Sequence, residues 1–363
     1  MLAIIPSANY YETYIYLCLF LLLCTFLHAL LLDINEKKNI IFINTVGYFL
    51  LVFFIILIGQ REITSRYGFG DTANYYKAFK AFSFGEPIND AKDFGWQLFM
   101  KTLSTIVTAH TFFTICTFLY IYPLYKISKQ LFKSYWYYCF FAFIVSFSFY
   151  AYGVNGVRNG VAASIFLWGL AYRENKVIMV LFFIWATMFH KTIMLPVLAY
   201  LLTYIYNNPK FYLKGWLICI PLSLAMGSVW ISLFASLGFD GRLSGYLTGD
   251  FAGEAPRFRW DFLFYSFFAV FAGWYYIYKK KFKDNFYNQL LNTYLICNGF
   301  WVLVIRANFS NRFAYLSWFM MAIVIFYPLL KQTLFKQHHI MLAKILVAYF
   351  TFTFLMYFVY YSK

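Results

Sequence analysis

The stretch YIYLCLFLLLCTFLHALLL, Tyr14 to Leu32, decides the class of fold because it contains no Asp, Glu, Lys or Arg. A helix needs about 20 mostly apolar residues to cross the hydrocarbon core of a bilayer. Similar runs recur as far as Tyr360, and 63% of the 363 residues are hydrophobic. The sequence therefore predicts an all-α, polytopic integral membrane protein in which residues 1–363 form a single membrane domain.

Hydropathy predicts about 12 transmembrane helices, within a range of about 10 to 13. The expected spans cover residues 12–32, 40–59, 97–122, 135–153, 158–172, 177–190, 192–206, 215–235, 261–278, 287–305, 312–330 and 341–361. The spans 177–190 and 192–206 are short, but we treat them as separate because merging them would invert the orientation of every later span.

Lysine-rich segments fall in alternate connections and predict the orientation of the chain. They lie at residues 35–38, 126–133, 172–176, 210–214, 279–283 and 331–336. Basic loops face the cytoplasm, so both termini and the connections 60–96 and 236–260 are expected outside. The net charge of +16 would suggest nucleic acid for a soluble chain. Here the lysines serve topology first, and we expect no nucleic acid partner.

The arginines follow a different distribution from the lysines. Eight of the nine are expected on the external side, namely Arg61, Arg66, Arg158, Arg242, Arg257, Arg259, Arg306 and Arg312. A guanidinium group offers a planar fork of donors that suits phosphate oxygens. The distribution predicts an anion site at the outer face, although single arginines also extend along apolar surface toward lipid headgroups.

Two of these arginines are expected in the first turn of a helix. Arg158 and Arg312 follow Asn155 and Asn311, which are candidate caps. A cation at a helix N-terminus opposes the helix dipole by roughly 0.3 to 1 kcal/mol when exposed. A phosphate bound there would remove the conflict, so we predict that Arg312, with Arg306 at the end of the preceding span, forms one side of a phosphate clamp.

The external connections 60–96 and 236–260 are expected to form part of the active site. The first holds the acids Asp71, Glu86, Asp90 and Asp93, and we favour Asp71 as a general base and Tyr75 as a residue that stacks on sugar. His190, at the outer end of a span, is the second candidate for proton transfer or phosphate binding. The glycine-rich second connection carries Arg242 and Tyr246 and suits a mobile lid.

No metal or cofactor site is expected. The external connections contain no DxD motif, and the six cysteines lie in apolar runs without metal-ligand spacing. A metal-independent reaction is therefore favoured, and a Mg²⁺ site assembled from acids that lie apart in the sequence is the alternative.

Short motifs occur in a fixed order that resembles the EpsG family of bacterial exopolysaccharide synthesis proteins. They are R-E at Arg61, G-x-G-D-x-x-x-Y from Gly68 to Tyr75, G-V-R-N-G around Arg158, F-H-K-T around His190, R-L-x-x-Y from Arg242 to Tyr246, and N-R-F-x-Y from Asn311 to Tyr315. The resemblance runs from about residue 40 to 330. One position departs from the pattern, because Asp93-Phe94-Gly95 stands where a glutamate before a glycine is expected.

The resemblance implies a membrane glycosyltransferase related in role to Wzy-type polysaccharide polymerases. Such an enzyme joins repeat units carried on undecaprenyl diphosphate, at the outer (periplasmic) face of the plasma membrane, into exopolysaccharide, capsule or O-antigen. Its partners would be these lipid-linked oligosaccharides, membrane lipid, a chain-length regulator and a flippase. The combined argument assigns Asp71 and His190 to catalysis and assigns substrate binding to Arg61, Tyr75, Arg158, Arg242, Tyr246, Arg306, Arg312 and Tyr315.

The strongest alternative is a flippase or transporter of the same lipid-linked oligosaccharide. A carrier of this kind is expected to show charged residues at mid-membrane depth and internal pseudo-symmetry. In this chain the charges gather at one face instead.

Overall fold

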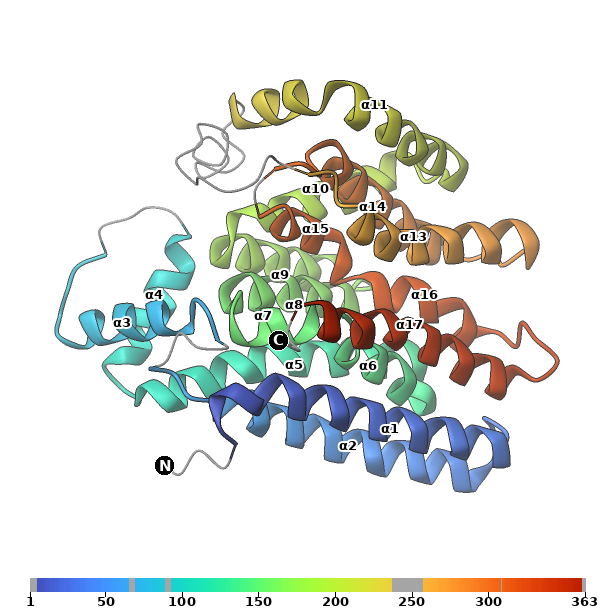
Figure 1. Cartoon of the computed structure of the whole chain (residues 1–363), viewed down its shortest axis with the longest axis horizontal. Helices are drawn as coiled ribbons and strands as arrows, with labels where there is room; N and C mark the ends of the chain where they lie inside the picture. Colours follow the sequence, from blue (N-terminus) through green and yellow to red (C-terminus); the bar gives the residue numbers. More distant parts are fainter. Residues whose placement is uncertain (1–4, 65–68, 89–92, 237–256, 308, 361–363) are drawn as a thin grey trace. The chain divides into compact units, whose positions relative to one another are not determined.

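The computed structural model describes residues 5–64, 69–88, 93–236, 257–307 and 309–360 (Figure 1). Within these ranges the regular elements are helices, which confirms the predicted all-α class. The chain divides into two compact units, one formed by Met1–Lys191 with Leu329–Lys363 and the other by Thr192–Pro328.

The first unit is built around helix α8, Val157–Ala171, whose side chains are almost all buried. Helices α5 and α9 pack on α8, α2 packs on α5, and α1 pairs with α17 (Figure 1). The bounds of the other helices are α1 Tyr10–Leu31, α2 Lys37–Gly59, α3 Thr72–Ser83, α4 Phe94–Ser104, α5 Ala109–Phe132, α6 Trp136–Ile144, α7 Phe149–Val154, α9 Lys176–Phe189 and α17 His338–Tyr360.

The second unit is built around helix α14, Asn285–Leu303, which contacts α10, α11, α13 and α15. Those helices are α10 Met194–Ile205, α11 Pro209–Ser236, α13 Trp260–Trp274 and α15 Asn311–Trp318, while α16, Met321–Lys331, ends within the first unit. Asn298 of α14 accepts a hydrogen bond from Trp216 (2.7 Å) and donates to Ser266 (3.1 Å) and Ser317 (2.9 Å). This buried network ties three neighbouring helices to α14.

Five described helical segments are long and apolar enough to cross a membrane. They are Ser7–Leu31, Lys37–Gly59, Pro209–Phe234, Asn311–Lys331 and His338–Tyr360. Shorter apolar helices cover Val157–Ala171, Lys176–Phe189 and Lys191–Ile205. The polytopic membrane class is therefore supported, while the predicted number of spans is not confirmed.

The structure interrupts two of the expected spans. Residues 97–122 fall in α4 and α5, with a break at residues 105–108, and residues 135–153 fall in α6 and α7. The Thr108 hydroxyl accepts a hydrogen bond from the Thr111 N–H (3.3 Å), which caps a new helix inside the apolar run. In contrast, α9 and α10 are separate helices joined by a short 3-10 turn, Lys191–Ile193, as the sequence predicts.

Candidate active site

Asp93 joins three segments of the first unit. Its Oδ2 atom lies 2.8 Å from Nη1 of Arg158 and 3.3 Å from Nδ1 of His190. Its Oδ1 atom accepts a hydrogen bond from the backbone N–H of Lys191 (2.8 Å). One carboxylate therefore connects the N-terminal end of α4, the first turn of α8 and the C-terminal end of α9.

Local sequence explains why Asp93 reaches the end of α9. Asp93 precedes α4 with φ of 52°, a left-handed conformation that Asp tolerates better than most residues. Gly95, in the first turn of α4, packs so closely on α9 that an added Cβ would lie 2.7 Å from Cβ of Met188. The glycine permits this approach, and the left-handed residue turns the carboxylate toward His190.

The Asp93 cluster, which we define as Asp93, Arg158 and His190, is largely shielded from solvent. The exposed fractions of these side chains are 7%, 17% and 15%. Burial alone would raise the pKa of Asp93, but the hydrogen bond from His190 and the positive charge of Arg158 lower it to about 2. The carboxylate is therefore ionised throughout the physiological range.

The cluster accounts for the unfavourable position of Arg158. Arg158 lies in the first turn of α8, as predicted, but the residue before the helix is Gly156, so Asn155 is not the cap. The Asp93 carboxylate offsets the opposition between the guanidinium and the helix dipole. Nε of Arg158 is buried without a hydrogen-bond partner among the described residues, so the guanidinium keeps donor capacity.

Asn155 is not a helix cap but forms a hydrogen bond with the segment that contains Asp71. Oδ1 of Asn155 accepts the backbone N–H of Asp71 (2.7 Å), and Asp71 itself precedes α3. Gly70, with φ of +51°, lies so close that an added Cβ would fall 2.4 Å from Oδ1 of Asn155. The backbone of Asp71, the predicted base, is therefore hydrogen-bonded to Asn155, which lies three positions before Arg158 in the sequence.

Arg61 contacts this segment through Thr72 and is fully buried. It donates from Nη1 to the carbonyl of Ile58 (2.7 Å) and from Nη2 to the hydroxyl of Thr72 (3.0 Å). Thr72 in turn donates to the carbonyl of Val154 at the end of α7. These contacts join the ends of α2, α3 and α7, so Arg61 supports the Asp71 segment from within the fold.

The predicted stacking residue Tyr75 is half-buried in α3 and packs edge-on against Trp96 of α4, with ring centroids 5.7 Å apart. Trp96 also packs against Phe189, the residue before His190, at 5.6 Å. The aromatic contact ties α3 and α4 to the end of α9 beside the Asp93 cluster.

The second unit holds the remaining described candidates. The side chain of Arg306 lies against Gly227 of α11, and Gly227 directly follows the non-helical residue Met226. The Nε atom of Arg306 is buried without a hydrogen-bond partner among the described residues. Arg312 lies in the first turn of α15, with its guanidinium carbon 5.1 Å from the ring centroid of Phe309, and Ser310 rather than Asn311 precedes the helix. Tyr315 is buried. Arg242 and Tyr246 lie outside the described residues.

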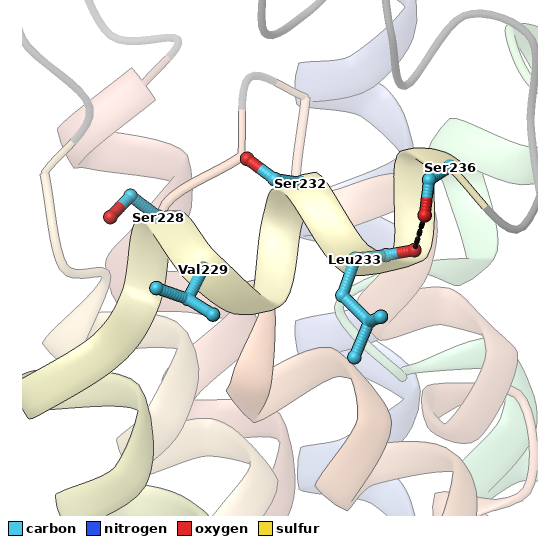
Figure 2. Close-up of a pocket in the computed structure, with 5 residues that line it drawn as sticks. All are labelled: Ser228, Val229, Ser232, Leu233 and Ser236. Carbon is cyan, nitrogen blue, oxygen red and sulfur yellow. Dashed lines mark hydrogen bonds between the residues drawn. The ribbon is translucent and has the colours of Figure 1, made fainter.

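Two open pockets lie elsewhere among the described residues. One of about 470 Å³ follows α11, where Ser228, Ser232 and Ser236 line it with Val229 and Leu233 (Figure 2). The other, about 410 Å³, is lined by residues of 33–36 together with Thr333, Lys336, His338 and His339. None of the predicted site residues lines either pocket. No group of three or more His, Cys, Asp or Glu side chains in the described part of the chain is placed to hold a metal ion.

The sequence does not single out two residues of this site. Asp93 is one of four acids in its connection and departs from the expected motif, and Asn155 is predicted to be a helix cap. The available signal for Asp93 was its position two residues before a glycine at the start of an apolar helix.

Comparison with known proteins identifies one family. The model of the EpsG family matches residues 47–363, a range that contains all the residues of the Asp93 cluster. No curated protein and no solved structure matches the chain.

Proposed function

This chain belongs to the EpsG family, and from that premise we propose that it is a polysaccharide polymerase acting on lipid-linked glycans. It joins oligosaccharide repeat units carried on undecaprenyl diphosphate, at the outer face of the bacterial plasma membrane. The product is an exopolysaccharide, capsule or O-antigen chain.

The contact of Arg158 and His190 with one oxygen of Asp93 is the observation that carries this proposal. Glycosyl transfer from a diphosphate needs a cation for the leaving group and a group that takes the proton of the attacking hydroxyl. The cluster offers both kinds of group within reach of a single carboxylate. The Asp71 segment, held by Asn155, adds a second candidate for the proton acceptor.

In the proposed reaction, the acceptor hydroxyl oxygen bonds to the anomeric carbon of the donor sugar, and the bond from that carbon to the diphosphate oxygen breaks. The electron pair leaves on the diphosphate, which Arg158 and the first-turn N–H groups of α8 stabilise. The hydroxyl proton passes to His190 or Asp71. No metal or cofactor takes part in this scheme.

The other predicted residues keep proposed roles in substrate binding. Tyr75 is proposed to contact sugar, and Arg242, Tyr246, Arg306, Arg312 and Tyr315 are proposed to bind the lipid-linked substrates. The burial of Arg61 favours an indirect contribution through Thr72 and the Asp71 segment. A chain-length regulator and a flippase are the proposed partners.

Deletion of the gene, followed by analysis of surface glycan, tests the function directly. Cells without the protein are expected to lose long chains while single repeat units still reach the surface. Accumulation of lipid-linked units inside the cell would instead favour the flippase alternative.

Substitution of Arg158 tests the site. Arg158→Lys keeps the charge but loses the planar fork of donors, so polymer length is expected to fall sharply. Arg173→Lys is the matched control, because Arg173 pairs with the exposed Glu174 at 3.1 Å, away from the Asp93 cluster. Normal polymer in the Arg158→Lys strain at wild-type expression would rule out this assignment.

Turnover and donor affinity separate the two candidate bases. Replacing the proton-accepting atom of the true base stops the reaction but leaves donor binding intact. Of Asp71→Asn and His190→Gln, the variant that removes the base is therefore expected to stop polymerisation and to keep donor affinity within a few-fold. A variant that weakens donor binding as Arg158→Lys does would mark a phosphate ligand.

A further inference from the structure

We propose that Asp93 is a positioning residue that fixes His190 as the general base and holds Arg158 beside it. The inference rests on the proposed function and deepens it, because it chooses between Asp71 and His190. It also assigns a role to a residue that the sequence motifs leave without one.

The first step of the argument is the hydrogen bond to the imidazole ring. An ionised carboxylate can only accept hydrogen bonds, so the ring nitrogen that it contacts must carry the proton. Asp93 contacts Nδ1 of His190 at 3.3 Å. The proton of the neutral ring is therefore held on Nδ1, and Nε2 is left with the lone pair that a base needs.

The second step is the orientation of the carboxylate itself. The backbone N–H of Lys191 donates to Oδ1 of Asp93, so the residue that follows the histidine fixes the rotation of the acid. The close approach of Gly95 to Met188 sets the distance between the two helices. A backbone hydrogen bond thus orients the carboxylate, and the close packing of α4 on α9 sets its distance from the imidazole, as a preorganised pair requires.

The third step is the charge that develops during the reaction. When Nε2 takes the proton of the acceptor hydroxyl, His190 becomes an imidazolium beside the ionised Asp93, which stabilises it. The anomeric carbon–oxygen bond to the diphosphate breaks at the same stage, and its electron pair leaves on the diphosphate next to Arg158. Because Oδ2 contacts both cations, the carboxylate holds the base and the leaving-group ligand at a fixed separation.

Asp93→Asn is the variant that tests this role, because asparagine is the other residue that tolerates a left-handed backbone. If its Oδ1 keeps accepting from the Lys191 N–H, its NH₂ group takes the place of Oδ2, where it faces His190 as a donor and no longer accepts from Arg158. The ring would then accept at Nδ1 and carry its proton on Nε2, which removes the base without removing the histidine.

The tautomer can be measured without any activity assay. Protein labelled with ¹⁵N-histidine is expected to show His190 protonated at Nδ1 in the wild type and at Nε2 in Asp93→Asn, with the signal assigned by its loss in His190→Gln. An unchanged tautomer in a folded Asp93→Asn variant would show that Asp93 does not set it and would refute the proposal. If wild-type His190 carries its proton on Nε2, the proposal is wrong, and this measurement does not require the variant to fold.

Turnover of purified protein on a synthetic undecaprenyl-diphosphate repeat unit gives the second readout. Asp93→Asn is expected to lose about 10²-fold to 10⁴-fold in turnover while affinity for the donor changes by less than about fivefold. Asp33→Asn is the matched control, since Asp33 makes the same kind of contact with Nδ1 of His339 (2.7 Å) outside the cluster. It is expected to keep wild-type turnover.

The outcomes separate this inference from the proposed function. If the wild-type protein forms no polymer from the repeat unit, the proposed function fails, whereas the tautomer result still reports on Asp93. If the wild type polymerises and a folded Asp93→Asn does so at the same rate, the function stands and the role of Asp93 is refuted.

Discussion

Gly70 shows how one residue without a side chain holds the Asp71 segment in place. Its φ is +51°, and an added Cβ would lie 2.4 Å from Oδ1 of Asn155. Gly70→Ala is expected to destabilise the protein by about 1 to 3 kcal/mol and to displace Asp71. Gly85→Ala is the control, because Gly85 also has a positive φ, +89°, but no neighbour within 4 Å. Thermal unfolding in detergent should therefore show a clearly larger loss for position 70, and equal losses would contradict the tight contact.

The lowered pKa of Asp93 makes the stability of the folded protein depend on pH in the acidic range. Its pKa in the folded protein is lowered from 3.8 to about 2 by His190 and Arg158, against the effect of burial. A carboxyl group with a lowered pKa stabilises the folded state above its unfolded pKa, and this contribution disappears as the pH falls through the folded value. The difference in unfolding temperature between wild type and Asp93→Asn is expected to narrow as the pH falls from about 4 to 2. A difference that grows between about pH 4 and pH 2 would show that the carboxylate is not the stabilising group.

At the scale of helices, Gly95 determines how closely α4 approaches α9. A methyl group at this position would lie 2.7 Å from Cβ of Met188 and 2.9 Å from its carbonyl oxygen. Gly95→Ala is expected to separate Asp93 from His190 and to lower turnover by about tenfold to a hundredfold, because a small misplacement of catalytic groups is costly. Gly215→Ala in α11, where nothing lies within 4 Å, is the control and should keep turnover. Equal activity of the two variants would mean that α4 and α9 need not be in close contact.

The same helices show what the sequence can and cannot reveal. Hydropathy located the apolar segments and the ends of α1, α2, α8 and α9 to within about three residues. It missed the break between α4 and α5, because averaging over an apolar window hides a cap such as Thr108. Residue type and helix position predict Arg158 and His190 as candidates, and their roles stay predictions. The contact of Asp93 with His190 spans 97 residues of sequence, and no local pattern encodes such a pairing.

At the scale of the whole molecule, the contacts of the Asp93 cluster constrain which segments can lie on the same side of the membrane. Lysine alternation predicts that Asp71, Asp93, Arg158 and His190 all lie on the external side. In the first unit, Asp93 contacts Arg158 and His190, and Asp71 is held by Asn155 near Arg158. A threading that placed these residues on opposite sides of a bilayer would conflict with their contacts. Helices α9 and α10 are separate elements, but the prediction that each is a span of its own, and with it the orientation of the later segments, stays a prediction.

The side of the membrane that carries the site is the last prediction. Glu86 follows α3 in the 60–96 connection, and Lys283 lies in the basic segment after α13, and both are exposed. In a cysteine-free background, Glu86→Cys is expected to react with a membrane-impermeant maleimide on intact cells, whereas Lys283→Cys should react only after the membrane is opened. Labelling of both variants in opened membranes is the control for reactivity. Labelling of position 283 alone on intact cells would place the Asp93 cluster on the cytoplasmic side, where exported repeat units could not reach it.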